Sequence, residues 1–234
     1  MSGKVPISEI FTSVQGEGMF VGTPMLFIRT AGCNVGKPAK ALKQPEPFPI
    51  LYTGRESSAC ITWDGRIFPC DTDYSKSGEL SNDDVVSMIK LSSFKHVCIT
   101  GGEPFLHAEW IEELFQKLEV MLHVETSGTI IPPLIYGEIC PNYWITCAPK
   151  LNAQREMIER ADEVKILVDS DFDLYKLTPE IRNHPNVFLC PINGVGNTPD
   201  QLNTDNIKRC YDLVTTTCKG WRISTQAHKQ FNWR

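Results

Sequence analysis

The sequence lacks the features that would place the protein in a membrane, outside the cell or on a nucleic acid. No run of about eighteen apolar residues occurs, which is the length that a membrane-spanning helix needs. The segment Met1–Pro6 has no apolar stretch of the kind that signal peptides carry. The net charge is −5, and no dense Lys/Arg tract interrupts it. We therefore expect a cytoplasmic protein that binds neither a membrane nor a nucleic acid.

The chain also lacks any pair of cysteines at the short Cys-x-x-Cys spacing, although it has nine cysteines. In a reducing compartment, thiols bind metals or pack in cores more often than they form disulfides. Six cysteines, several of them in apolar patterns, are assigned to the core: Cys98, Cys140, Cys147, Cys190, Cys210 and Cys218. The other three, Cys33, Cys60 and Cys70, lie in one stretch among glycine, asparagine, serine and aspartate.

Three thiols from one loop suit a 4Fe–4S cluster whose fourth iron is open to a ligand that is not protein. A structural zinc site is the alternative, but zinc normally takes four protein ligands, often from two Cys-x-x-Cys pairs. No histidine lies near the loop to complete such a set. Nine residues separate Cys60 from Cys70, and the stretch Ile61–Phe68 resembles a hairpin with Asp-Gly as its turn. Antiparallel pairing could therefore bring these two thiols together.

The length of 234 residues and the ordinary hydrophobic content of 41% indicate one globular domain, residues 1–234. Four prolines between Gly36 and Glu56 exclude regular structure there, so we predict an inserted loop within the cysteine stretch 33–74. The segment Ile7–Val14 alternates apolar and polar residues imperfectly and leads into a glycine-flanked loop around Glu17.

Beyond Tyr74, strand and helix patterns alternate. Ser81 with Asp84 resembles a capping box, and Trp110–Leu118 shows apolar residues at helical spacing. A last helix is predicted from Thr198 to about Cys218. Short apolar runs predict strands at 25–29, 96–100, 121–125, 143–147, 164–168, 187–190 and 221–224. This alternation indicates a parallel sheet, either open or curled into a partial barrel.

Polar or glycine-rich residues follow four of these strands directly. They are Thr100–Glu103, Glu125–Ser127, Ala148–Lys150 and Pro191–Asn193. Each alone is only a turn between a strand and a helix. Because ligands of parallel α/β folds bind at the carboxyl ends of the strands, their recurrence points to one shared site.

Five motifs occur in order along the chain: Glu9-Ile10-Phe11-x-Ser13-x-Gln15-Gly16-Glu17-Gly18, Phe27-Ile28-Arg29-x-x-Gly32-Cys33-Asn34, Cys70-Asp71-Thr72-x-Tyr74, Thr100-Gly101-Gly102-Glu103-Pro104 and Gln226-Ala227-His228-Lys229. Together they resemble the 7-carboxy-7-deazaguanine synthase family of radical S-adenosylmethionine (SAM) enzymes, from about Ile7 to the C-terminus. Gly101-Gly102-Glu103 alone would identify only the superfamily, whereas the first and last motifs narrow it to this family. Many members place the last two cluster cysteines at the Cys-x-x-Cys spacing, from which Cys60 departs.

The resemblance implies a homodimeric, compacted partial (β/α) barrel that binds a 4Fe–4S cluster, SAM and Mg²⁺. One electron from the cluster would cleave SAM to methionine and a 5′-deoxyadenosyl radical, which would abstract hydrogen from 6-carboxy-5,6,7,8-tetrahydropterin. Ring contraction with loss of ammonia would then give 7-carboxy-7-deazaguanine, as in queuosine-type biosynthesis. A flavodoxin- or ferredoxin-like protein would supply the electron.

The resemblance also implies roles for individual residues. The cluster ligands would be Cys33, Cys60 and Cys70, and Thr72 would bind magnesium. The residues expected to line SAM are Gly102, Glu125, Thr126, Ser127, Ala148, Pro149, Lys150, Cys190, Pro191, Ile192 and Asn193. Those expected to hold the substrate are Val14, Gln15, Gly16, Arg29, Thr100, Gln226, His228 and Arg234. Without the family, Arg29 would be assigned to a structural ion pair and Thr72 to a helix cap.

The end of the chain adds a prediction of its own. Residues 225–234 follow the last predicted strand, and Phe231 and Trp233 would be exposed to water in an untethered tail. We therefore expect this tail to be ordered and to close the substrate pocket, where the terminal carboxylate of Arg234 could accept hydrogen bonds from the pterin. Two other functions stay open: another radical SAM enzyme, such as a glycyl-radical activating enzyme, and a non-catalytic metal-binding domain.

Overall fold

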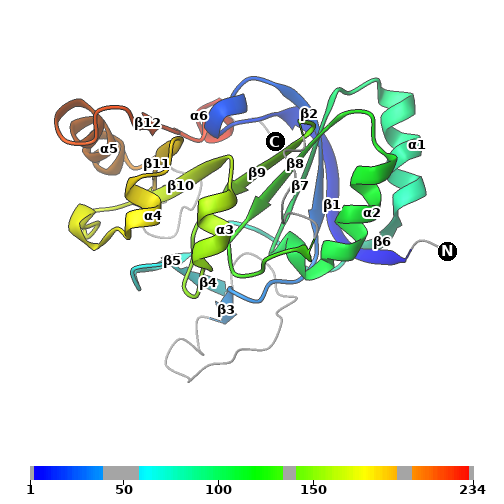
Figure 1. Cartoon of the computed structure of the whole chain (residues 1–234), viewed down its shortest axis with the longest axis horizontal. Helices are drawn as coiled ribbons and strands as arrows, with labels where there is room; N and C mark the ends of the chain where they lie inside the picture. Colours follow the sequence, from blue (N-terminus) through cyan, green and yellow to red (C-terminus); the bar gives the residue numbers. More distant parts are fainter. Residues whose placement is uncertain (1–2, 39–57, 134–140, 194–201, 232–234) are drawn as a thin grey trace.

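The computed structural model describes residues 3–38, 58–133, 141–193 and 202–231. Its centre is a nine-stranded sheet in the order β12-β11-β10-β9-β8-β7-β2-β1-β6 (Figure 1). The strands in that order are Arg222–Ile223, Val187–Pro191, Glu163–Val168, Tyr143–Cys147, Met121–Thr126, His96–Gly101, Pro24–Thr30, Lys4–Val14 and Gly78–Ser81. Neighbouring strands from β12 to β2 are parallel, so the predicted mostly parallel sheet is confirmed.

One edge of the sheet departs from this pattern. β1 pairs antiparallel with both β2 and β6, and a register shift lies between Ile7 and Glu9. This irregularity explains the imperfect alternation of the N-terminal sequence, because a bulge changes which side chains share a face. The sequence did not predict β6.

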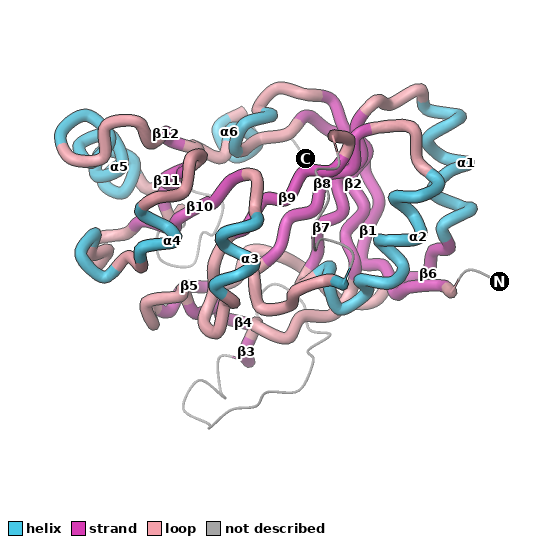
Figure 2. Tube along the Cα trace, viewed as in Figure 1, coloured by secondary structure: helices cyan, strands magenta, loops and turns pink. Residues whose placement is uncertain are grey.

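The helices are α1 Asn82–Ser92, α2 Ala108–Lys117, α3 Arg155–Arg160, α4 Pro179–Arg182, α5 Thr204–Thr216 and α6 Ala227–Gln230, as Figure 2 shows along the trace. The capping box of α1 is confirmed, since Ser81 and Asp84 bond each other's backbone N–H groups. The predicted helix start at Thr198–Gln201 lies outside the described residues, and the predicted continuous helix is wrong at Leu202 and Asn203, which are not helical; α5 begins after Asn203, whose side chain accepts the N–H of Asn206. None of the helices in the described ranges is long and apolar enough to cross a bilayer.

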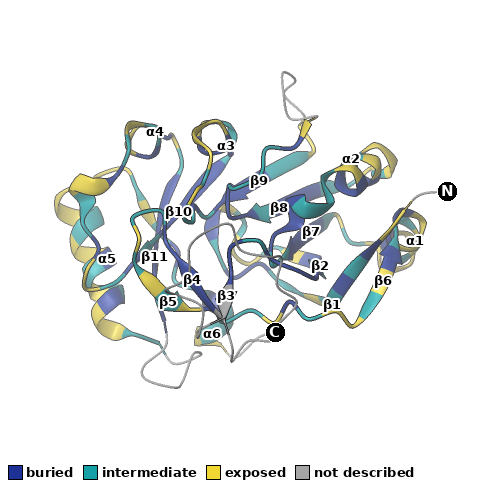
Figure 3. Cartoon of the chain, turned by 90° about the horizontal axis from the view of Figure 1, so that it is seen from below, coloured by how far each residue is buried: buried dark blue, intermediate teal, exposed yellow. Residues whose placement is uncertain are grey.

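The two faces of the large sheet differ in chemistry because side chains alternate along each strand. One face carries apolar residues such as Val97, Leu122 and Ile145, which pack in the main core with Trp110 and Leu114 of α2. In Figure 3, α2, α3 and α4 lie on one side of this sheet, whereas α6 and a smaller sheet lie on the other. The face opposite the core carries the polar side chains: Thr100, His123, Glu125, Thr146, Glu163 and Lys165.

The loop between β1 and β2 covers part of this polar face. Phe20, in the short 3-10 helix Gly18–Phe20, packs edge-on against His123 and Trp144, with ring centroids 4.5 and 4.9 Å apart. The backbone N–H of Met19 donates to Glu163 Oε2 at 2.8 Å. The loop thereby brings Gln15, Gly16 and Glu17 over this polar face, which we call the inner face of the sheet.

A smaller three-stranded sheet carries the cysteine loop. It consists of β3 (Lys37–Pro38), β4 (Ser58–Ile61) and β5 (Ile67–Pro69). The predicted Asp-Gly hairpin is confirmed, since β4 and β5 pair antiparallel. The exclusion of regular structure is wrong at the start of the insertion, because Lys37 and Pro38 pair with β4 at its edge, where proline is tolerated. The rest of the insertion, 39–57, lies outside the described residues.

Candidate active site

The structure brings Cys33, Cys60 and Cys70 together. All three are buried and share a small cluster with Val35 and Tyr74. The hairpin register explains the approach of the last two: Cys60 lies opposite Phe68, so that Cys70 follows just beyond the paired residues. A hydrogen bond joins the thiols of Cys60 and Cys70.

The protein environment keeps the thiols of Cys33 and Cys60 protonated when no metal is bound. Burial raises the pKa of Cys33 to about 11, even though its sulfur accepts hydrogen bonds from Gly36 N at 3.3 Å and Val35 N at 3.4 Å. The hydrogen bond to Cys70, followed by burial, raises the pKa of Cys60 well above its ordinary value. Metal binding to such thiols releases protons, and two backbone donors already face the sulfur of Cys33.

The three gathered thiols form the donor set of an iron–sulfur cluster. As the side chains stand in the described ranges, no group of three or more His, Cys, Asp or Glu side chains is placed to hold a single metal ion. Cysteines that hold a 4Fe–4S cluster each bind a different iron, so they surround the cluster and do not meet at one point. The donor set of three gathered, buried thiols therefore fits a 4Fe–4S cluster with one iron left open.

The loop after β7 is locked against the cysteine loop. The N–H of Glu103 donates to Gly32 O at 3.1 Å, and a Cβ atom on Gly102 would lie only 2.1 Å from the same oxygen. Glycine is therefore required at position 102 for this approach. The Glu103 carboxylate accepts Thr126 Oγ1 and Ser127 N, both at 2.8 Å, and the Ser127 hydroxyl. Burial raises the pKa of Glu103, against these hydrogen bonds.

The remaining residues that the sequence assigns to SAM divide between two places. Lys150 forms a backbone bridge with Thr62, and its ammonium lies 5.6 Å from the ring centroid of Phe68, so Ala148–Lys150 lies beside the hairpin. Asn193 instead reaches the C-terminal segment, where its Nδ2 donates to Gln226 Oε1 at 2.6 Å. Cys190 and Pro191 are buried in β11, and Ile192 O accepts Asn206 Nδ2 at 2.7 Å.

A second polar network lies on the inner face of the sheet. Lys165 Nζ bonds Glu17 Oε2 at 2.6 Å and lies 3.5 Å from Glu125 Oε1. Glu125 also accepts Gln15 Nε2 at 3.1 Å and Thr100 Oγ1 at 3.2 Å. The structure thus joins Gln15 and Thr100, expected at the substrate, to Glu125, which the sequence assigned to SAM.

The charges of this network stabilise each other. Burial alone would raise the pKa of Glu17, but the charges of Lys165 and His228 and the bonds to Lys165 and Gln226 lower it to about 2. Burial alone would lower the pKa of Lys165, but Glu125 and Glu17 raise it well above its ordinary value. Both groups are therefore ionised at neutral pH, in a place that water reaches poorly.

The C-terminal segment closes over the Gln15–Glu17 loop. Ala227 N donates to Gly16 O at 2.8 Å, and Gln226 Nε2 donates to Glu17 Oε1 at 2.7 Å. A Cβ atom on Gly16 would lie 2.3 Å from His228 Nδ1, so the imidazole packs directly on this glycine. Of the predicted tail, Ala227–Gln230 forms α6, but the expectation that Phe231 would be covered is wrong. Phe231 is 61% exposed, and Trp233 and Arg234 lie outside the described residues.

The comparisons with known proteins agree with this geometry. No family model matches the chain. The 7-carboxy-7-deazaguanine synthase of Buchnera aphidicola subsp. Schizaphis graminum is 33% identical over 235 residues, which span 96% of each chain. The enzyme of the same name from Escherichia coli K12 is 30% identical over 97% of this chain and 98% of its own. This chain belongs to the 7-carboxy-7-deazaguanine synthase family.

A solved structure of the family has the same fold. The crystal structure of QueE from Escherichia coli aligns with a TM-score of 0.61 and 28% identity, over 96% of this chain and 95% of its own. The predicted family and fold class are therefore confirmed. Both ends of the alignment fall near the chain termini, so the N-terminal strands and the C-terminal strand belong to the shared fold.

Three of the predicted site residues have neighbours that bear on their roles in a synthase of this family. Arg29 forms an ion pair with Glu9, with Nε–Oε1 at 2.9 Å. Thr72 lies in an irregular segment, so the alternative of a helix cap is wrong, and its hydroxyl is 3.5 Å from Asp71 Oδ1. Val14 ends β1, opposite Pro24. The assignment of these residues to substrate and magnesium stays a prediction.

The sequence did not single out two residues at the centre of the site of this family member. Lys165 lies in the apolar run Glu163–Val168, where one lysine between hydrophobic neighbours was the available signal. Glu17 was noted only as an acid between glycines. Five of the six cysteines assigned to the core are confirmed as buried, and Cys140 lies outside the described residues.

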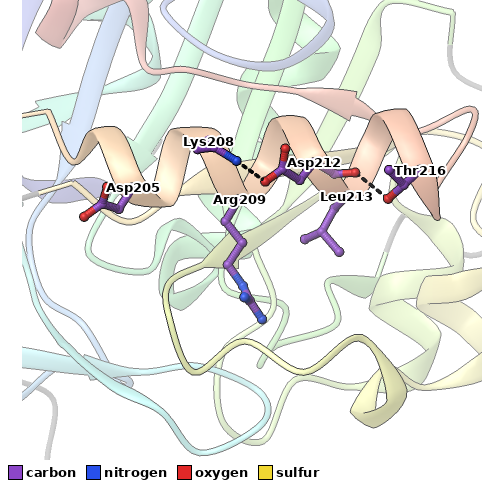
Figure 4. A pocket seen from close by; sticks show the side chains of 6 residues that line it. All are labelled: Asp205, Lys208, Arg209, Asp212, Leu213 and Thr216. Carbon is purple, nitrogen blue, oxygen red and sulfur yellow. Dashed lines mark hydrogen bonds and ion pairs between the residues drawn. The ribbon is translucent and has the colours of Figure 1, made fainter.

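One surface hollow is unrelated to the synthase site. It has a volume of about 300 Å³ and lies along α5, between Asp205 and Thr216 (Figure 4). Lys208 and Asp212 form an ion pair across its rim, and Arg209 points down from the helix. None of the predicted site residues lines it.

Proposed function

We propose that this chain is a radical SAM enzyme that converts 6-carboxy-5,6,7,8-tetrahydropterin to 7-carboxy-7-deazaguanine with loss of ammonia. The observation that carries the proposal is the gathering of three buried thiols beside Gly102 and Glu103, in a chain of this family. We regard residues 1–234 as one radical SAM domain, since the inner network joins Glu17 of the N-terminal loop to Gln226 of the C-terminal segment.

Cys33, Cys60 and Cys70 would hold the 4Fe–4S cluster, and SAM would bind at the adjoining strand ends. When bound, the cluster supplies the electron that cleaves SAM and so starts hydrogen abstraction from the substrate. Around the proposed cluster, the protein itself would keep the cysteine loop and the neighbouring strand end rigid. Glu103 ties Thr126 and Ser127 to the cysteine loop, so the strand end and the loop hold a constant separation.

The inner network would orient the substrate. The pKa of Glu17 is lowered to about 2, so its carboxylate is ionised at neutral pH and would accept hydrogen bonds from the amino and ring N–H groups of a pterin edge. Gln15 offers an amide, and Thr100 a hydroxyl, beside it. Arg29 would bind the substrate carboxylate through its guanidinium fork, for which arginine is suited. His228 and Gln226 would complete the wall, with the carboxylate of Arg234.

Other parts of the proposal rest on the family resemblance. Magnesium would bind Thr72, whose hydroxyl is a hard oxygen ligand, near Asp71. Asp71 also pairs with Lys229 Nζ at 2.5 Å, which links this segment to α6. The chain would act as a homodimer and receive electrons from a flavodoxin- or ferredoxin-like protein.

Anaerobic reconstitution with iron and sulfide tests the proposal. We expect a brown protein with about four irons per chain, as a 4Fe–4S cluster requires. With SAM, a chemical reductant and 6-carboxy-5,6,7,8-tetrahydropterin, mass spectrometry should detect 7-carboxy-7-deazaguanine. Bound zinc without iron would favour a non-catalytic metal-binding domain. A cluster that cleaves SAM but leaves the pterin unchanged would favour another radical SAM enzyme.

A further inference from the structure

The hairpin that carries Cys60 and Cys70 needs support from outside itself. Only three residue pairs join β4 to β5, from Ala59–Pro69 to Ile61–Ile67. A two-stranded hairpin of this size is marginally stable in water, and β3 adds only two residue pairs to it within the described residues. In a short Cys-x-x-Cys turn, the geometry of the turn itself would fix the positions of the two thiols. Here nine residues separate Cys60 from Cys70, so the positions of their thiols depend on the contacts that hold the hairpin in place.

One arginine at the tip of the hairpin connects it to the large sheet. Arg66 Nη1 bonds Asp169 Oδ1 at 2.6 Å, and Nη2 donates to Leu167 O at 2.9 Å. Arg66 Nε bonds Asp64 Oδ2, across the turn, at 2.8 Å. The guanidinium also lies 5.4 Å from the ring centroid of Phe172. We call Asp64, Arg66, Asp169 and the Leu167 carbonyl the hairpin clasp.

The clasp is shielded from water, which makes its contacts stronger than those of surface ion pairs. The side chains of Asp64, Arg66 and Asp169 are 2%, 11% and 22% exposed. The planar guanidinium of Arg66 donates hydrogen bonds to three acceptors at once, an arrangement that the ammonium of lysine cannot reproduce. The clasp therefore restrains both the position and the orientation of the hairpin tip.

A second anchor holds the opposite side of the hairpin. Leu151 N donates to Ile61 O at 3.0 Å, and Thr62 bridges to Lys150. This anchor lies after β9, whereas the clasp lies at the end of β10. Two anchors on neighbouring strand ends fix the hairpin against rotation, which one alone would allow.

We propose that Arg66 is a positioning residue that fixes the Cys60 and Cys70 thiols for the metal cluster by clamping the hairpin onto Asp169 and Leu167. The clasp would take the place of the short Cys-x-x-Cys turn that this chain lacks. It would also hold the cluster loop in register with the strand ends proposed to bind SAM. In its reference to a cluster, the inference rests on the proposed function, but the clamping of the two thiols does not.

The test uses the full-length protein and the conservative variants Arg66→Lys and Asp169→Asn, with Arg155→Ala as control. Arg155 forms an exposed ion pair with Glu159 on α3, so its loss removes an arginine without touching the hairpin. In the metal-free protein, alkylation followed by peptide mass spectrometry measures how fast each thiol reacts. In the reconstituted protein, iron loss to a chelator and the electron paramagnetic resonance spectrum with and without SAM report on the cluster.

We expect Cys60 and Cys70 to be alkylated at least about tenfold faster in Arg66→Lys and Asp169→Asn, while Cys98 keeps its rate, because breaking a desolvated ion pair costs about 1.4 kcal/mol or more. Iron loss should accelerate by a similar factor, and the spectral response to SAM should broaden. The double variant should be no worse than Arg66→Lys alone, since the contact of Arg66 with Asp169 is already disturbed in that variant. The control should match the unmodified chain.

Unchanged alkylation of both thiols in folded Arg66→Lys and Asp169→Asn, or equal acceleration at Cys98, would overturn the clasp. If the variants fail to fold by circular dichroism, a purely structural role replaces the positioning role. An unmodified chain that binds no iron would reject the proposed function alone. The alkylation rates would then still decide whether the clasp restrains the two thiols.

Discussion

Replacing Lys165 by methionine tests the inner network most directly. The substitution keeps the length of the side chain and removes its charge, at a position that is 7% exposed. Glu17 and Glu125 would then face each other without a cation. The lowering of the Glu17 pKa from 4.5 to about 2 corresponds to about 3 kcal/mol, at about 1.4 kcal/mol for each pKa unit. Lys165 is the largest of the causes that lower this pKa, so Lys165→Met should lose most of that stability at pH 7.

The pH dependence of stability should change sign in this variant. In the unmodified chain, Glu17 has a folded pKa below its unfolded value, so its contribution is present above pH 4.5 and is lost as the pH falls towards 2. Without Lys165, burial is the largest remaining influence on Glu17 and acts to raise its pKa. The protonated carboxyl is then the favoured form in the folded state, and stability is lost as the pH rises. Lys165→Met should therefore be more stable at pH 5 than at pH 7, relative to the unmodified chain.

Urea unfolding of the metal-free protein, followed by circular dichroism at pH 5 and pH 7, measures both effects. Lys208→Met is the matched control, because the pair of Lys208 with Asp212 is exposed and should contribute little. Adding Glu17→Gln to Lys165→Met should recover part of the lost stability at pH 7 and flatten its pH dependence. Equal losses in the two lysine variants, or a pH dependence that does not change, would refute the reasoning.

Four further outcomes are expected. Cys60→Ala should abolish the visible absorption of the reconstituted cluster, whereas Cys98→Ala, in the core, should retain it. Thr72→Ala should weaken the dependence of turnover on magnesium and leave the cluster absorption intact; equal activity with magnesium and with chelator would reject this role. Glu103→Gln should lower the free energy of unfolding by about 1–3 kcal/mol in urea titrations, because an amide cannot accept every donor around it. Truncation before His228 should raise the substrate KM and spare SAM binding, since Gly16 loses its cover; unchanged kinetics would contradict this.

The order of the strands was predictable because their chemistry is local. Short apolar runs predicted the central strands to within a residue or two, and the capping box placed the start of α1. The strand predicted at 221–224 forms as β12, whereas the edge strand β6 was not predicted, because a pairing partner distant in the sequence decides its existence. The start of α5 depends on Asn203, a good cap that an earlier Thr-Pro signal obscured.

The site residues that belong to sequence motifs could be predicted, whereas those that form ion pairs between distant parts of the chain could not. The three cysteines stood out by composition, and the hairpin register then brought Cys60 to Cys70. The ion pair between Lys165 and Glu17 joins residues 148 positions apart, so no local sequence pattern around either residue predicts it. Arg66 was hidden for the same reason, since its partner Asp169 lies 103 positions away.

The inner network joins residues near both ends of the chain, so it can form only after the C-terminal residues have been synthesised. Glu17 meets Gln226 across 209 positions, and Gly18 meets Ser224 across 206. During synthesis, the N-terminal loop therefore leaves the ribosome long before any of these partners exists, and non-local contacts of this kind form late. The thiols of the cysteine loop are made early as well, so the half-built chain exposes them without the strands that later enclose them. If the chain binds the proposed cluster, we expect cluster insertion into the finished pocket to follow translation.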